Sequence, residues 1–371
     1  MDRKEEIDIK EKKVLNLMEE LNLNAILLKT QANFSWFTGG GINEVAITEN
    51  QGVASILVTR EKRYIVSNNI ESLRMMEEEG LKELGFSLIE YNWFESSEED
   101  ALLKLFPKNQ IGCDLEGYGY INCSKRIAEL RYQLLEAEIE RYLWLGRKTS
   151  IAIETVLNMA RPGVRECLLT GEILRILWND RIDSVCNQSG SDERTRKYRH
   201  AIPTEKRINN YIMLNVNARK WGLVTAITRT AYLGKRDKKL EKQYRDTVEI
   251  ECGLIAASRP NTPLKELFGV VKSLYEKYGY PNEWKHHHQG GAQGYKNREY
   301  VIMPNSKEKI LRNQCFCWNP TIAGNEYGTK SEDAFIATDN GPLMVTGPAL
   351  FPVIKLTIGG IEFNRPDILW L

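Results

Sequence analysis

The 371-residue chain has no hydrophobic run long enough to cross a membrane and almost no excess of charge of either sign. A membrane-spanning helix needs about 20 mainly apolar residues, whereas runs such as 53–58 have only the length of a strand. The 51 Lys and Arg residues against 50 Asp and Glu residues leave a net charge of +1, which gives no electrostatic reason to expect a nucleic-acid partner. The charged segment Met1–Glu6 also differs from a signal peptide. We therefore expect a cytoplasmic protein with neither a membrane nor a nucleic acid as partner.

Paired cysteines and the common catalytic motifs are missing as well. The seven cysteines are scattered, odd in number and never spaced as CxxC, which argues against a disulfide framework or a structural zinc site. The sequence contains no GxxxxGK[ST], no GxGxxG after a strand, no HExxH and no GxSxG. Nothing in it therefore indicates a phosphate-binding loop, a zinc peptidase helix or the nucleophile of a serine hydrolase.

Alternating strand and helix patterns predict a small α/β domain over about the first 130 residues. We expect helices over 9–21, 70–80 and 98–105, and strands over 24–28, 53–58, 63–66, 87–91 and 110–114. A long helical period over 135–160 then ends at Arg161-Pro162-Gly163, which is a stop signal. We place the domain boundary just before this helix, which gives domains 1–134 and 135–371.

The second domain reads as α+β, because strands and helices are interleaved without a regular order. Helices are predicted over 166–179, 239–258 and 264–278, and strands over 211–217, 223–233, 314–318 and 333–337.

Three features of this domain could carry chemistry. His200 lies on a polar loop before a strand, where a histidine can act as a general base or simply face solvent. His286, His287 and His288 precede a glycine turn; neighbouring side chains diverge, so we expect one or two of them to line a site rather than three to bind one metal. Glu332, before the last predicted strand, is either a site carboxylate or part of a solvated turn.

The order and spacing of these segments resemble the pita-bread family of methionine aminopeptidase, proline dipeptidase, Xaa-Pro aminopeptidase and creatinase. The resemblance rests on the N-terminal stretch 32–39, the linker helix 138–160 with Pro162-Gly163, the loop 200–204, and the segment 215–230, which ends in Ile-Thr-Arg-Thr. It covers nearly the whole chain. It implies a C-terminal pita-bread domain preceded by a smaller, creatinase-type α/β domain.

The metal ligands of this family are mostly not retained at the matching positions. Its peptidases hold two divalent metals with two Asp, one His and two Glu, and the resemblance places these on Asn215, Ala226, Gly291, Asn319 and Glu332. Only Glu332 keeps the ligand type, and two dications need several anionic oxygen or imidazole donors. We therefore expect no metal and no other cofactor.

Creatinase, which works without a metal, shares several of these departures. The resemblance assigns His200 the role of catalytic histidine, and Asn215 matches the residue that creatinase has at the first Asp position. It assigns Glu332 the role of a guanidinium-binding carboxylate and Arg298 that of a carboxylate clamp. Thr228 stands where creatinase has a second guanidinium-binding Glu, so creatine itself is a poor substrate candidate.

The resulting hypothesis is a metal-independent hydrolase of a C–N bond in a small amide, amidine or guanidino compound. His200 would act as general base and then as general acid, with Glu332 binding an N–H-rich group. The other residues expected to bind substrate are Asn215, Thr228, His287, His288, Arg298 and Asn319. The family resemblance also implies a homodimer, in which Trp36 and Phe37 would help to close the pocket of the partner.

Two alternatives remain at this stage. One is a catalytically inactive member of the family that binds a small molecule or a protein, because a fold does not fix a function. The other is an Xaa-Pro aminopeptidase or dipeptidase, against which the missing metal ligands argue.

Overall fold

The structure, a computed structural model, describes residues 1–324 and 326–371, which divide into two compact units. The first unit comprises Met1–Glu138 with Trp221–Leu223, and the second comprises Ile139–Lys220 with Val224–Leu371. In the described part of the chain, no helix combines the length and the apolar character needed to cross a membrane.

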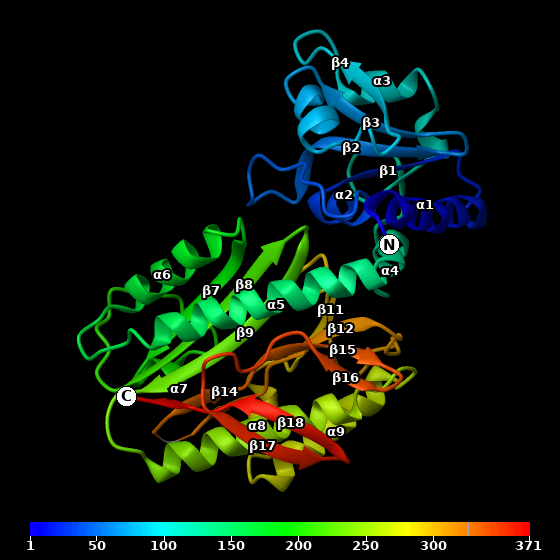
Figure 1. The fold of residues 1–371 in the computed structure, drawn as a ribbon. Helices are drawn as coiled ribbons and strands as arrows, with labels where there is room; N and C mark the ends of the chain where they lie inside the picture. The colour runs from blue at the N-terminus through cyan, green and yellow to red at the C-terminus, as the bar shows by residue number, and fades with distance from the viewer. Residues whose placement is uncertain (325) are drawn as a thin grey trace. The chain divides into compact units, whose positions relative to one another are not determined.

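The first unit is built on a six-stranded mixed sheet with the strand order β4-β3-β2-β1-β5-β6 (Figure 1). Its strands are β1 (Ala25–Thr30), β2 (Gln51–Thr59), β3 (Arg63–Asn68), β4 (Ser87–Tyr91), β5 (Ile111–Cys113) and β6 (Ile121–Asn122). Its helical segments are α1 (Arg3–Glu20), α2 (Gln31–Phe37), η1 (Arg74–Glu78), α3 (Glu98–Leu103), η2 (Lys108–Gln110) and α4 (Ser124–Leu130). Helices α1 and α2 contact β1 and β2, and α3 contacts β3 and β4.

Local sequence signals account for most of these elements. Helix α1 begins earlier than its apolar stripe predicts, because Asp2 and Glu5 form a capping box at its N-terminus. Strands β2 and β3, both predicted, pair antiparallel, and the turn between them is held by a hydrogen bond from Lys62 N to Thr59 Oγ1 (3.1 Å). The predicted helix 70–80 is shorter in the structure, where 72–78 is helical and most of that segment, Arg74–Glu78, is a π-helical turn.

The second unit contains a four-stranded sheet, β19-β9-β8-β7, a five-stranded sheet, β11-β10-β12-β15-β16, and the two-stranded sheets β13-β14 and β17-β18. The strands are β7 (Asp183–Ser191), β8 (Tyr211–Lys220), β9 (Leu223–Tyr232), β10 (Gly290–Gln293), β11 (Tyr300–Val301), β12 (Gln314–Trp318), β13 (Thr321–Ala323), β14 (Gly328–Lys330), β15 (Asp333–Thr338), β16 (Gly341–Met344), β17 (Val353–Ile358), β18 (Ile361–Pro366) and β19 (Leu369–Trp370). The helices are α5 (Glu136–Leu157), α6 (Glu166–Trp178), α7 (Arg194–Lys197), α8 (Lys238–Ala257), α9 (Leu264–Lys277) and the short η3 (Glu283–Lys285).

Helices cover the sheets of the second unit from outside. Helix α6 packs on β7 and β8, while α8 packs on α9, β12, β14 and β17. Buried side chains from α8, α9 and the strands form one apolar core, in which Phe316 stacks on both Trp318 and Phe335. The two larger sheets are joined by a hydrogen bond from Thr228 N to the Glu332 carbonyl (3.1 Å), and the candidate site lies at this junction.

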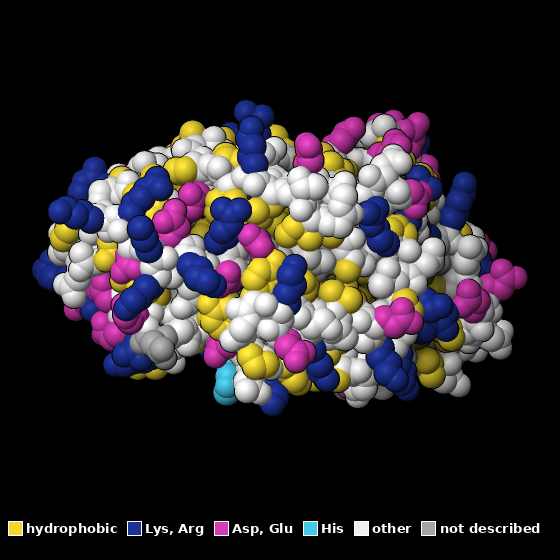
Figure 2. All heavy atoms as spheres, turned by 90° about the horizontal axis from the view of Figure 1, so that it is seen from below, with side chains coloured by type: hydrophobic (Ala, Val, Ile, Leu, Met, Phe, Trp, Pro, Cys, Tyr) yellow, Lys and Arg dark blue, Asp and Glu magenta, His cyan; other side chains and the backbone are white. Residues whose placement is uncertain are grey.

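Charged side chains of both signs are spread over the face drawn in Figure 2. Neither lysine and arginine nor aspartate and glutamate gather into one large patch there.

Candidate functional site

The carboxylate of Glu332 is the centre of the candidate site. It lies just before β15 and is almost completely buried. Its Oε2 atom accepts hydrogen bonds from Asn215 Nδ2 and Thr228 Oγ1, both at 2.7 Å. Its Oε1 atom accepts from Arg298 Nη2 at 3.2 Å and more weakly from Asn319 Nδ2 at 3.5 Å. The structure thus brings together five of the residues singled out in the sequence. Both oxygens of the Glu332 carboxylate accept hydrogen bonds from protein donors.

The segments that meet at Glu332 explain this arrangement. Asn215 lies on β8 and Thr228 on the neighbouring β9, so both side chains point toward the same junction. Asn319 follows β12, and Arg298 lies between β10 and β11 in the other sheet. Four segments besides the one that carries Glu332 therefore supply this cluster, which no single sequence motif could have revealed.

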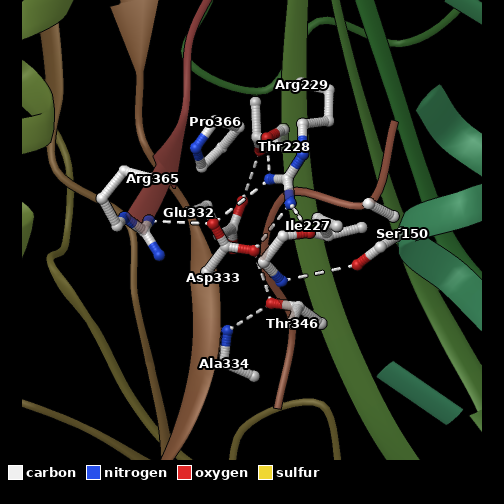
Figure 3. A network of polar contacts seen from close by, with 12 residues as sticks. Ser150, Ile227, Thr228, Arg229, Glu332, Asp333, Ala334, Thr346, Arg365 and Pro366 are labelled. Carbon is white, nitrogen blue, oxygen red and sulfur yellow. Dashed lines mark hydrogen bonds and ion pairs between the residues drawn. The ribbon is translucent and has the colours of Figure 1, made fainter. Parts of the chain in front are cut away.

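A buried ion network behind Glu332 holds the start of β15 in place (Figure 3). Arg229 contacts Glu154 (2.8 Å) and Asp333 (3.0 Å), and Arg365 contacts Asp333 (2.8 Å) and Glu251 (2.5 Å). All five side chains are at most 1% exposed. Because Asp333 is the next residue after Glu332, this network fixes the backbone that carries the site carboxylate.

The pKa values of two carboxylates in this network are shifted in opposite directions. Burial raises the pKa of Glu251 to about 7, against the lowering effect of Arg365. Burial also acts to raise the pKa of Asp333, but Arg229 and Arg365 on either side lower it overall. Asp333 therefore stays ionised between the two guanidinium groups at neutral pH.

His200, His287 and His288 form a second cluster beside the first. The Nε2 atoms of His200 and His287 are 3.0 Å apart, and the rings of His287 and His288 stack with centroids 4.6 Å apart. Gly290 N donates to His288 Nδ1 at 3.1 Å, which orients that ring. His287 is buried, whereas His200 and His288 are accessible and His286 lies outside the cluster. The structure thereby settles which members of the triplet join His200.

Thr321 connects the histidine cluster to the carboxylate cluster. Its hydroxyl is 3.3 Å from His287 Nδ1 and donates to the Asn319 carbonyl at 3.1 Å. The candidate site is thus one continuous polar region that runs from His200 to Glu332.

All three imidazoles are kept neutral at pH 7. Partial burial and then the positive charge of Lys330 lower the pKa of His200 below its ordinary 6.5. Burial likewise lowers the pKa of His287, and it lowers that of His288 to about 4. A neutral imidazole near neutral pH can accept a proton from water or bind a metal ion.

Lys330, Arg199 and Cys317 belong to the site but were missed in the sequence. Lys330 on β14 is buried, and its Nζ donates to Gln188 Oε1 (3.3 Å) and to the Arg199 carbonyl (3.2 Å). Cys317 donates its thiol hydrogen to Glu332 Oε1 at 3.7 Å, and burial raises the pKa of the thiol well above its ordinary value. Lys330 and Cys317 lie on separate strands and Arg199 in the turn after α7, and no local pattern marks any of them.

Trp36 and Phe37 do not join the site. Both lie on α2 in the core of the first unit with no exposed surface. Phe37 packs edge-to-face against Phe86, and the Trp36 carbonyl accepts from Lys10 Nζ at 2.6 Å. The structure corrects the expectation that these rings bind substrate, since their apolar surface is already used inside the first unit.

Comparison with protein families adds a decisive finding. Residues 144–339, more than half of the chain, match the model of metallopeptidase family M24. The chain belongs to metallopeptidase family M24.

Relatives within and around this family share the whole fold. An Xaa-Pro dipeptidase from Pyrococcus horikoshii is 22% identical over 363 residues, which cover 91% of this chain and 96% of the relative. A prolidase structure from Thermococcus sibiricus has a TM-score of 0.79 at 16% identity, with 100% of both chains covered. An Xaa-Pro dipeptidase structure from Bacillus anthracis has a TM-score of 0.77 at 16% identity and covers 98% of this chain and 100% of its own. These likenesses confirm the predicted fold, a pita-bread domain preceded by a smaller N-terminal domain.

The residues at the matched ligand positions do not fit the pair of divalent metals that the family resemblance implies. Asn215 and Asn319 are neutral and already donate to Glu332, and Ala226 has no side-chain donor. A side chain at Gly291 would place its Cβ 2.0 Å from the Tyr300 carbonyl oxygen. The backbone of β11 therefore occupies the space that a histidine would need.

A single metal has a different set of donors available. In the part of the chain that the structure describes, ligand atoms of His200, His287 and His288 lie within 4.8 Å of one another, close enough to be drawn together by one ion. Two of the three consecutive histidines contribute to this group, within the expectation that one or two of them line a site. Lys330 and Arg298 act on the same rings as positive charges, however, and oppose a dication there.

Proposed function

We propose that this member of the M24 family is a metal-independent hydrolase of a C–N bond in a small amide. The observation that carries the proposal is the guanidinium of Arg298 on the Glu332 carboxylate, 3.2 Å away. In the resemblance, Glu332 is the one retained ligand position. A guanidinium at this carboxylate supplies the positive charge that a metal would otherwise bring.

His200 is the proposed catalytic residue. It is accessible to solvent, and its lowered pKa keeps the ring unprotonated at pH 7, as a general base must be. Its Nε2 atom lies 3.0 Å from His287 Nε2, so His287 orients the ring. The pair therefore provides a base together with a neighbour that fixes its direction.

Two unpaired polar atoms beside Glu332 favour an amide as the reacting group. Among the described residues, Arg298 Nε and Asn319 Oδ1 are buried without a hydrogen-bond partner. The first can donate to a carbonyl oxygen, and the second can accept from an amide N–H. A guanidino group would instead bring a further cation beside Arg298, where Glu332 has no oxygen left free.

The reaction is a hydrolysis in two proton transfers. His200 takes a proton from water as the oxygen attacks the carbonyl carbon. The imidazolium then gives that proton to the leaving nitrogen as the C–N bond breaks. The products are a carboxylic acid and an amine, and neither an oxidant nor a cofactor enters the balance.

The test compares His200→Ala with His286→Ala, a matched change at an exposed histidine outside the cluster. Both variants and the wild type are incubated with a panel of small N-acyl amino acids in buffer with EDTA, and released amine is measured. We expect turnover by the wild type and His286→Ala, and a loss of about 100-fold or more in His200→Ala. Full activity in folded His200→Ala would overturn the mechanism.

A catalytically inactive, ligand-binding protein is the second candidate. It is favoured by the same saturated carboxylate, because Glu332 contacts five protein donors and is not free to act on a substrate. Binding of a panel compound without turnover would establish it. The peptidase alternative has its own readout, which is release of proline from Xaa-Pro dipeptides when manganese is added.

A further inference from the structure

Helices α5 and α6 of the second unit (Figure 1) border an open cavity. It has a volume of about 600 Å³, and pockets that hold small ligands commonly measure about 300–1,000 Å³. One side is lined by four residues of α5 that share one helix face, since they are spaced at i, i+3, i+4 and i+7: Trp144, Arg147, Lys148 and Ile151. The last turn of α6 and the segment 179–182 line the other side. The cavity shares no described lining residue with the candidate site.

Much of the lining of this cavity is apolar. Leu177 and Ile182 are buried, whereas Trp144, Ile151 and Ile176 are only partly buried. The latter three therefore keep apolar surface that a ligand could cover. Removing such surface from water is favourable, and it needs no particular direction of approach. The cavity is thus suited to the apolar part of a ligand.

An ion pair links the two sides of the cavity. Lys148 Nζ lies 2.9 Å from Asp180 Oδ2, and so connects α5 to the segment after α6. The same ammonium group lies 5.3 Å from the centroid of the Trp144 ring. Lysine has three N–H donors, and Asp180 accepts from one of them. Lys148 can therefore also donate to a ligand without leaving Asp180.

Arg147 gives the lining of the cavity a net positive charge. It is exposed, and its guanidinium makes no hydrogen bond or ion pair within residues 1–324 and 326–371. Such an arginine is ordinary on a polar surface, but this one lies beside apolar side chains. Arg147 and Lys148 stand against Asp180 alone, which leaves one excess positive charge on the lining. A guanidinium matches the geometry of a carboxylate, and one carboxylate neutralises one charge.

We propose that this cavity binds an organic monoanion with an apolar tail, namely the carboxylate of a medium-chain fatty acid. The tail packs against Trp144, Ile151 and Ile176, and the carboxylate accepts hydrogen bonds from Arg147 and Lys148. None of these residues belongs to the proposed catalytic machinery, so the binding goes beyond the proposed function and does not depend on it.

Titration calorimetry with octanoate at pH 7 and constant ionic strength tests the proposal. We expect saturable binding at one site. Neutral octan-1-ol should bind about 5-fold more weakly, because a partly exposed charge contact adds little. Hexanoate should bind about 10-fold more weakly, since it leaves two methylene groups fewer to bury. Absence of saturable octanoate binding would overturn the proposal. Equal affinity for octan-1-ol would overturn the assignment to an anion, and equal affinity for hexanoate would overturn the role of the tail.

A variant that fills the cavity locates the site. Ile176→Trp places a larger ring where the tail would lie, and should weaken octanoate binding about 10-fold or more. The matched control is Leu168→Trp, at a residue of the same helix that is 47% exposed and outside the cavity. Ile151→Trp takes the place of the first variant if that protein does not fold. Unchanged octanoate affinity in the folded variant would contradict the site.

A second variant tests the charge. Arg147→Met should weaken octanoate binding about 5-fold and leave octan-1-ol binding unchanged. Its control is Arg175→Met, at an arginine of α6 that is 64% exposed and outside the cavity. Equal octanoate affinity in Arg147→Met and the control would contradict the role of Arg147. His200→Ala should bind octanoate like the wild type, so a failure of the proposed catalysis and a failure of this site are separable.

Discussion

Removing Arg298 tests the charge arrangement on which the site depends. The change Arg298→Met keeps an unbranched side chain but leaves the Glu332 carboxylate, 4% exposed, without its cation. Breaking a buried ion pair from one side costs about 3–5 kcal/mol. Asn215 and Thr228 still donate to Oε2, so we expect the lower end of that range, about 3 kcal/mol.

The assay is a double-mutant cycle with Glu332→Gln, in which the free energy of unfolding is measured by urea denaturation. A loss of about 3 kcal/mol is large beside a total of about 5–15 kcal/mol, and it lowers the melting temperature by about 6–12 °C for a domain of this size. The double variant should recover part of the loss, with a coupling energy of up to about 3 kcal/mol.

A matched surface pair provides the control for this cycle. Arg312→Met removes a cation from Asp339, where both side chains are more than half exposed, and should cost no more than about 1 kcal/mol. The reasoning is refuted if Arg298→Met costs no more than the control and its effect adds to that of Glu332→Gln within about 0.5 kcal/mol.

Three further predictions concern protons and the metal position. The activity (kcat/KM) should rise with pH through a pKa below 6.5 and then stay level, because partial burial and Lys330 lower the pKa of His200. The variant Lys330→Met should move this pKa upward. A pH profile of Lys330→Met that equals that of the wild type would argue against His200 as the base. The free energy of unfolding should fall as the pH drops from 6.5 to about 4, because the unfolded chain then binds a proton that folded His288 does not. In His288→Asn this free energy, measured by urea denaturation at each pH, should fall less steeply. An equally steep fall in the variant would show that His288 is not its source. Gly291→His should destabilise the fold without creating manganese affinity, since its Cβ would lie 2.0 Å from a backbone oxygen. A stable variant that binds manganese would contradict the conclusion that β11 leaves no room for a side chain at this position.

The regular elements of both units follow from signals that a sequence displays. Strands β2 and β3 and helices α8 and α9 have clear apolar periods, and the structure places them within a few residues of the predicted ranges. Strand β7 escaped prediction because its mixed polar residues carry no alternating pattern. The short β10 escaped as well, because its glycines leave no side chains from which a period can be read.

Some residues of the candidate site could also be predicted from the sequence, and others could not. The cluster around Glu332 was predictable because the family resemblance assigns its positions, and the structure brings those residues together. Lys330 could not be found in this way, since its burial beside the neutral acceptors of Gln188 and Arg199 is visible only in the folded chain. Trp36 was misplaced because an aromatic residue beside a glycine turn reads equally well as a surface contact or as core.

The most direct test of the central claim is the metal content of the protein. The chain is purified without a chelator or a His tag, equilibrated with manganese, freed of unbound ions and measured by elemental analysis. The account predicts no stoichiometric metal and amide hydrolysis that survives EDTA. About two tightly held ions per chain, as in a dinuclear hydrolase, would contradict it and restore the peptidase reading. A single ion that is lost in His288→Asn would contradict it as well and place that ion on the three histidines.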